Sequence, residues 1–239
     1  MARLMLGLVV FLGLLLIGGR VWSPGTADPT VPKAGGDTTA TVTEPEEPAV
    51  AVDRGALRSA VAAVGSSAYL DSVFGRDSLL RRWVGRDRDP VRVAITPGPV
   101  AGSAQAGYLR EALAIWEGVG LGLRFREVAP GDTTAELRVQ WVATPDGERS
   151  GVTEVRSTSQ GRILGATITL ALGSPSGAPL SPEGQRAVAV HEVGHAIGLP
   201  HSGDPNDVMF PQTRSPSLTA RDRNTATLLY RISAGSLRQ

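Results

Sequence analysis

Residues 191–201 read HEVGHAIGLPH, and this stretch decides how the rest of the chain is interpreted. It contains all three histidines of the protein. His191 and His195 are four positions apart, so on a helix their rings project from one face, one turn apart. Two imidazoles arranged in this way can hold a single metal ion. The carboxylate of Glu192, beside the first imidazole, can reach a water molecule on that ion.

A third ligand has to come from beyond the helix, because His201 lies six residues after His195. Gly198 resolves this, since glycine can adopt a positive φ, end the helix and turn the chain back. Pro200 then prevents the helix from resuming. With His201 as third ligand, three neutral imidazoles and one water form the tetrahedral arrangement of a catalytic zinc site. Gly194 is a poor helix residue, which suggests that another backbone element approaches there.

The flanking sequence predicts strands and helices in alternation. Strands are expected at 91–95, 123–128, 136–142, 151–157 and 161–170, and helices at 52–83, 103–117, from 181 onward, and from about 218 to 232. Ser181 and Pro182 have the residue types of an N-cap and a first helical position. Thr219 and Asp222 have the spacing of a capping box, with Asp in place of Glu or Gln.

The segment HEVGHAIGLPHS, followed by DPNDVMFP at 204–211, resembles the metzincin metallopeptidases and the matrixin branch in particular. Matrixins read H-E-x-G-H-x-x-G-L-x-H-S, then a short Asp-Pro segment and a Met-turn. Ser202 matches the serine that marks matrixins, and Met209 matches the Met-turn methionine, an apolar floor beneath the zinc ligands. The resemblance is sharp over 186–230, topological over 90–180, and does not extend to 1–85.

The resemblance implies an α+β, metzincin-like fold: a twisted mixed sheet of about five strands with an active-site helix, a backing helix and a C-terminal helix. It also implies one catalytic zinc and hydrolysis of internal peptide bonds in extracellular or envelope proteins. Glu192 would act as general base and then acid. The extended polypeptide substrate would pair with an edge strand, either 151–157 or the start of 161–170. The wall at 210–216 would border the main pocket, where Arg214 either favours acidic substrates or is simply solvated.

The chain also departs from the pattern of larger matrixins. It lacks upstream histidines for a second, structural zinc and any cysteine for a cysteine switch. No calcium loop is recognisable, which leaves calcium binding open. Where many members carry two adjacent acids in the last helix, this chain has Arg221 and Asp222, which puts pairing of the first acid with a freed amino terminus in doubt. Asp222 is expected to support the Met-turn. These absences indicate a minimal, bacterial-type member.

Four segments are expected along the chain. Residues 1–22 contain a long apolar run and are predicted to be a signal peptide or a membrane anchor. Residues 23–51, rich in proline and threonine, form a disordered linker. Residues 52–85 are a helical lead-in or an inhibitory pro-segment, and residues 86–239 form the matrixin-like catalytic domain. Either reading of the first segment places the protein outside the cytoplasm, secreted or membrane-anchored.

Composition narrows the classes of protein. The 239-residue chain has a formal net charge of +1, so it offers no electrostatic case for nucleic-acid binding. The absence of cysteine excludes disulfide scaffolds, iron–sulfur sites and thiol nucleophiles.

A monomer is expected. The alternative to a peptidase is a zinc-binding but non-catalytic adhesion or interaction domain on a membrane stalk, against which the presence of Glu192 argues.

Overall fold

A computed structural model describes part of the chain. The described residues are 55, 59–60, 62–63, 65–70, 79–98, 104–144, 149–174, 176–213, 215–232 and 235–236. All of them lie in the compact unit Glu47–Gln239. The predicted leader at 1–22 and linker at 23–51 lie outside the described residues. Within the described ranges, no helix is long and apolar enough to cross a membrane.

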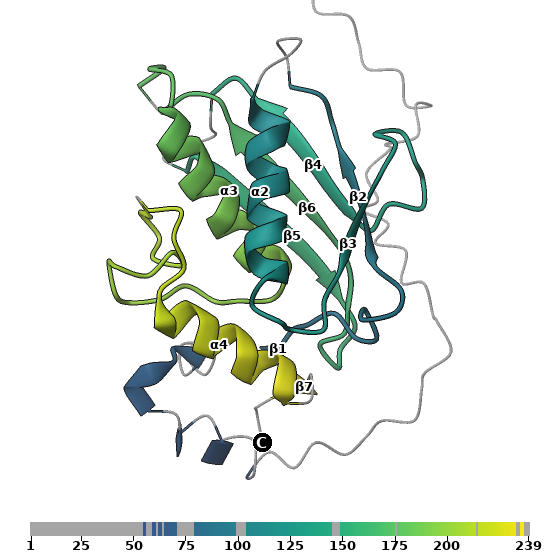
Figure 1. The fold of residues 1–239 in the computed structure, drawn as a ribbon, viewed down its shortest axis with the longest axis vertical. Helices are drawn as coiled ribbons and strands as arrows, with labels where there is room; N and C mark the ends of the chain where they lie inside the picture. Colours follow the sequence, from purple (N-terminus) through teal and green to yellow (C-terminus); the bar gives the residue numbers. More distant parts are fainter. Residues whose placement is uncertain are drawn as a thin grey trace, which may run out of the picture. The chain divides into compact units, whose positions relative to one another are not determined.

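A five-stranded mixed sheet forms the centre of this unit (Figure 1). In spatial order it consists of β3 (Phe125–Val128), β2 (Val91–Ile95), β4 (Leu137–Val142), β6 (Ile163–Ala171) and β5 (Gly151–Ser157). The first four strands are parallel, and β5 pairs antiparallel with β6 at the edge. The predicted α+β sheet is confirmed. The suggestion that the start of 161–170 is the free edge is wrong, because Arg162 is bridged to Arg82 there and β6 then lies between β4 and β5.

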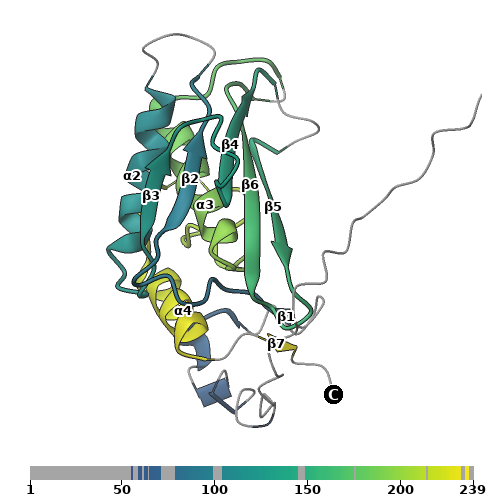
Figure 2. The same cartoon turned by 90° about the vertical axis from the view of Figure 1, so that its right-hand side faces the viewer.

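Helices α2 (Gln105–Glu117) and α3 (Pro182–Ala196) cover the same face of the sheet, as Figure 2 shows from the side. The predicted apolar stripe of α2 is buried: Leu109, Ala112, Leu113 and Trp116. The indole Nε1 of Trp116 donates a hydrogen bond to the carbonyl of Val190 at 2.9 Å. This bond ties the backing helix to the turn of α3 that precedes the histidines, so the two helices share one fixed position over the sheet.

Local capping signals set where α3 and α4 (Ala220–Arg231) begin. The Ser181 hydroxyl accepts from the Gly184 amide, with Pro182 as the first helical residue. Thr219 and Asp222 form the full capping box at the start of α4. Asp is therefore long enough to close this box, and both predicted helix starts are confirmed.

The segment before β2 differs from its prediction. Described residues between 55 and 63 are helical and Gly65–Ser67 form a 3-10 turn. Leu79–Leu80, however, form strand β1, antiparallel to β7 (Gly235–Ser236), so the prediction of a helix to Trp83 is wrong there. Leu80 and Trp83 are buried in the core of the sheet domain. Burial against distant elements has overridden the local helical periodicity.

Candidate active site

Helix α3 presents two histidines whose rings are fixed by backbone carbonyls. His191 Nδ1 lies 2.7 Å from the carbonyl oxygen of Val208, and His195 Nδ1 lies 2.8 Å from that of Leu199. A carbonyl can only accept, so each Nδ1 carries the proton and each Nε2 keeps its lone pair for a metal. Burial lowers the pKa of His191, which keeps that imidazole neutral, as a metal ligand must be.

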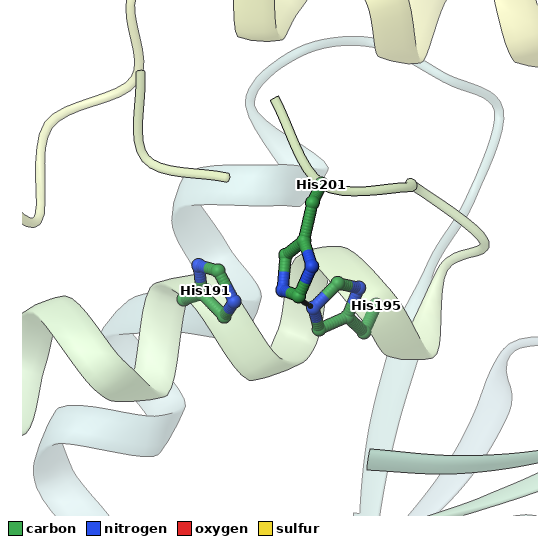
Figure 3. A group of neighbouring side chains, drawn as sticks. All are labelled: His191, His195 and His201. Carbon is green, nitrogen blue, oxygen red and sulfur yellow. Dashed lines mark hydrogen bonds between the residues drawn. The ribbon is translucent and has the colours of Figure 1, made fainter. Parts of the chain in front are cut away.

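The third histidine reaches the same place through a turn that requires glycine. Gly198 has φ +102°, and a Cβ at this position would lie 1.9 Å from the carbonyl oxygen of Arg81. Both facts exclude a larger residue. The chain then returns beside α3, so that His201 Nε2 lies 3.1 Å from His195 Nε2 (Figure 3). The predicted role of Gly198 as the point where the chain reverses matches this geometry.

The three imidazoles together form a group that could hold a metal ion. One nitrogen from each of His191, His195 and His201 lies within 4.8 Å of the others. Two nitrogens bound to one tetrahedral zinc at about 2.0–2.1 Å are separated by about 3.4 Å. The observed spacing of 3.1 Å between two of them is close to that requirement. Three neutral nitrogen donors with no thiolate or carboxylate suit zinc, so the residues present fit the ion that the resemblance implies.

Met209 packs against α3 at Gly194, which lies between His191 and His195 in the sequence. It is fully buried, and a Cβ on Gly194 would lie 2.3 Å from its sulfur and 3.1 Å from Trp116 Cζ2. The expectation that another backbone element approaches Gly194 is therefore wrong in detail, because side chains approach it. Gly194 therefore leaves room for the thioether of Met209 against α3.

Two buried carboxylates hold the loop between His201 and α4. Asp207 accepts from the hydroxyl of Ser202 and from Arg221 Nε at 3.0 Å. Asp222 accepts from the amide of Val208 at 3.0 Å, one residue before Met209. The backbone amide of Ser202 also donates to the carbonyl of Met209 at 2.9 Å. Asp222 thus contacts the backbone of the Met-turn directly, and Arg221 pairs with Asp207.

Glu192 reaches from α3 to the edge strand β5. Thr153 Oγ1 lies 2.6 Å from Glu192 Oε2 and 3.0 Å from its backbone carbonyl. A Cβ on Gly151 would lie 2.5 Å from Oε1, so the carboxylate occupies space that only glycine leaves open. Burial raises the pKa of Glu192 to about 7, against the opposing effects of the Thr153 hydrogen bond and the charge of Arg149.

A groove of about 1210 Å³ runs past these groups. The edge strand β5 forms one wall, the three histidines and Glu192 lie at its base, and Pro211–Thr213 contribute from the segment after the Met-turn. Leu79 and Arg81 from the N-terminal segment also line it. Part of the predicted wall at 210–216 therefore borders the groove, whereas Arg214 lies outside the described residues.

Several supporting residues carried no signal of their own in the sequence. Thr153 lies on the predicted strand 151–157. The candidate edge position of this strand is the one feature of the sequence that places Thr153 near a substrate groove. Trp83 Nε1 donates to the carbonyl of Ala196 at 3.0 Å, which satisfies the end of α3 from 113 positions away. Tyr69 donates to Asp222 from 153 positions away. Such pairs depend on the finished fold rather than on local spacing.

Three converging imidazoles, a buried carboxylate on the same helix and an open groove along an edge strand form an arrangement that suits a metal-dependent hydrolase. The sequence model of the matrixin family matches residues 183–231, the region that carries this site. Over residues 183–231 the chain is similar to matrixins, and its α+β fold is consistent with a matrixin-like metzincin. A stretch of 53 residues is 42% identical to matrilysin from Felis catus, covering 22% of this chain and 17% of matrilysin's length. These matches support a metallopeptidase.

Proposed function

We propose that this chain is a zinc-dependent metalloendopeptidase that hydrolyses internal peptide bonds of extracellular or envelope proteins. The observation that carries the proposal is the convergence of His191, His195 and His201 beside Glu192 at the base of a groove with a free strand edge. The three histidines would hold the ion, and Glu192 would be the catalytic carboxylate. When bound, zinc would supply Lewis acidity, lowering the pKa of its water toward about 7 and polarising the scissile carbonyl.

Glu192 would move the proton in this reaction. Its Oε2 is engaged by Thr153, whereas no hydrogen bond from another described residue reaches Oε1. Oε1 would therefore take the proton from the attacking water as the oxygen–carbon bond forms. It would then pass that proton to the leaving amine nitrogen as the carbon–nitrogen bond breaks. Thr153 would keep the carboxylate aimed into the groove in both steps.

The substrate would be an extended polypeptide paired with strand β5. The backbone groups along the outer edge of β5 face away from β6, so they are available to an added strand. Pairing through the backbone tolerates many sequences, and the side-chain pockets along the groove would set the preference. The 1210 Å³ groove is large enough for several side chains of such a peptide.

The remaining expectations belong to the same proposal. Residues 1–22 would be a signal peptide or membrane anchor and residues 23–51 a linker, placing a monomeric peptidase outside the cytoplasm. Tyr69, Leu80 and Trp83 are buried in the same core as the sheet. This burial favours a lead-in packed on the domain for the described part of 52–85, and it favours a domain that begins before residue 86.

The test compares the full chain with Glu192→Ala, measuring cleavage of an unfolded protein and the zinc content of both. We expect equal, stoichiometric zinc and a loss of nearly all turnover in the variant, because the proton then has no carrier. Retained turnover in Glu192→Ala would contradict the role given to Glu192. Zinc in both proteins with activity in neither would favour a non-catalytic adhesion or interaction domain.

A further inference from the structure

A buried tyrosine from the N-terminal segment reaches the start of α4. Tyr69 is 3% exposed, and its hydroxyl donates to Asp222 Oδ1 at 2.7 Å. Burial and the negative charge of Asp222 raise the pKa of this hydroxyl, so it remains a donor. Asp222 is fully buried. A buried carboxylate depends on its donors for its orientation, because water is not there to replace them.

Two further hydrogen bonds lead from Asp222 to a histidine of the site. Asp222 Oδ2 accepts from the amide of Val208 at 3.0 Å. The carbonyl oxygen of the same residue, Val208, accepts from His191 Nδ1 at 2.7 Å. Tyr69, Asp222, Val208 and His191 therefore form one continuous, buried hydrogen-bonded chain. Its last member is a residue that we assign to the metal.

The tyrosine hydroxyl has a distinct place in this chain. Thr219 donates to Asp222 Oδ2 from its amide at 2.8 Å, alongside the Val208 amide. Among the described residues, Tyr69 is the donor to the other oxygen, Oδ1. With both oxygens held, the carboxylate plane is fixed and Val208 meets a well-placed acceptor. Without the hydroxyl, the carboxylate can tilt toward the donors at the start of α4 and away from the Val208 amide.

The effect of the Tyr69 hydroxyl can be separated from the packing of residues 65–70 against α4. The backbone amide of Tyr69 donates to Thr225 Oγ1 at 3.1 Å, which attaches residues 65–70 to α4 through the backbone. Asn224 Nδ2 adds a bond to the carbonyl of Ser67 at 3.2 Å. A variant that lacks only the tyrosine oxygen keeps both of these contacts, so the two effects can be measured apart.

We propose that Tyr69 is a positioning residue for the three-histidine site, acting through Asp222 and Val208 on the orientation of His191. This inference rests on the proposed function, since it takes the histidines to be metal ligands. It gives a role to a residue from the segment upstream of β1. The histidine site then includes support from a part of the chain that lies before the sheet begins.

The experiment uses the full chain as wild type, Tyr69→Phe and the matched control Asn224→Ala, which removes only the bond to the carbonyl of Ser67. Zinc affinity is measured by competition with a chromogenic chelator, and thermal unfolding is measured on the zinc-free proteins. Direct partners of ligating histidines typically contribute about 10- to 100-fold to metal affinity. For the more remote Tyr69 we expect a loss of about fivefold in Tyr69→Phe. Asn224→Ala should lower the unfolding temperature while leaving zinc affinity unchanged.

Each outcome decides the inference. An unchanged zinc affinity in Tyr69→Phe would reduce the hydroxyl to a purely structural contact, and equal losses in both variants would assign the effect to docking of the segment. In an Asp222→Asn background, adding Tyr69→Phe should cost no further zinc affinity, because both changes act in one chain. An additive loss would overturn the inference. Absence of zinc binding by the wild type would instead overturn the proposed function itself.

Discussion

At the scale of single residues, the position of Glu192 at the base of the groove depends on Gly151, which has no side chain. Gly151 begins the edge strand, and the carboxylate of Glu192 fills the space where its Cβ would be. The Thr153 hydroxyl holds the same carboxylate from the next residue of β5 on that face. One strand therefore both borders the groove and sets the position of the proposed proton carrier.

Gly151→Ala should displace Glu192 with little effect on folding. The new methyl group would lie 2.5 Å from Oε1, and a flexible side chain, rather than backbone, has to move. We expect activity to fall by about tenfold or more, equivalent to about 1.4 kcal/mol in the barrier. Zinc content and unfolding temperature should stay close to wild type. The measurements are turnover on an unfolded protein, elemental zinc and thermal unfolding.

The matched control for this change is Gly131→Ala, whose Cβ would meet no atom within 4 Å. This variant should behave as wild type in all three measurements. Wild-type turnover in Gly151→Ala would show that the position of Glu192 is not set by the edge strand.

At the scale of elements, the end of α3 is built by the N-terminal segment that crosses it. The indole of Trp83 donates to the carbonyl of Ala196, the last residue of the helix. The carbonyl of Arg81 lies directly against Gly198, where the chain turns toward His201. The reversal that brings in the third histidine is therefore shaped from outside the helix as well as by its own sequence.

Gly198→Ala should destabilise the protein strongly. The residue has φ +102°, and its Cβ would lie 1.9 Å from the backbone oxygen of Arg81. Either the turn or the backbone at Arg81 would have to move, and both movements cost free energy. We expect the free energy of unfolding to fall by about 3 kcal/mol or more in denaturant titrations. The control is Gly203→Ala, at an exposed position where an added Cβ would meet no atom within 4 Å. A loss as small as that of the control would contradict the close contact.

The elements that could be predicted are those whose signals are local. Ser181 and Pro182 mark the start of α3, and Thr219 and Asp222 mark the start of α4, all within four residues of the effect. Strand β1 carried no such signal, because its partner β7 lies at the other end of the chain. The apolar residues before β2 fit a helical pattern equally well, and only their distant partners made part of them extended.

At the scale of the whole molecule, a metal at the three histidines would act as a cross-link. It would join helix α3 to the loop that carries His201, and that loop leads through Met209 to α4. Binding to the folded state alone stabilises that state by mass action, by about 4 kcal/mol when free zinc exceeds the dissociation constant a thousandfold.

Removal of zinc should therefore lower the unfolding temperature of the wild-type protein. For a domain of this size, about 4 kcal/mol corresponds to a fall of about ten degrees. The measurement is thermal unfolding with added zinc and with excess chelator. His201→Ala lacks one of the three nitrogen donors, so its unfolding temperature should respond far less to chelator. An equal response in both proteins would argue against zinc at the histidines.

The architecture and the site differ in how far the sequence predicted them. The sheet of five strands, its covering helices and the spacing of His191, His195 and His201 follow from periodicity and motif. Residues that hold the site in place, such as Thr153 and Tyr69, do not, because their partners lie 39 and 153 positions away. Spacing along a chain specifies which groups share a helix face, but not which distant side chain orients them.

The bond between Asp222 and the Val208 amide has a consequence for the order of events during synthesis. A ribosome delivers the chain from its amino end at about 5–20 residues per second. The histidines emerge before α4, yet the aspartate that braces the Val208 backbone belongs to α4, near the carboxyl end. An incomplete chain thus carries all three histidines without the brace that fixes them. Completion of the last helix would therefore be the step that fixes His191 through the backbone of Val208.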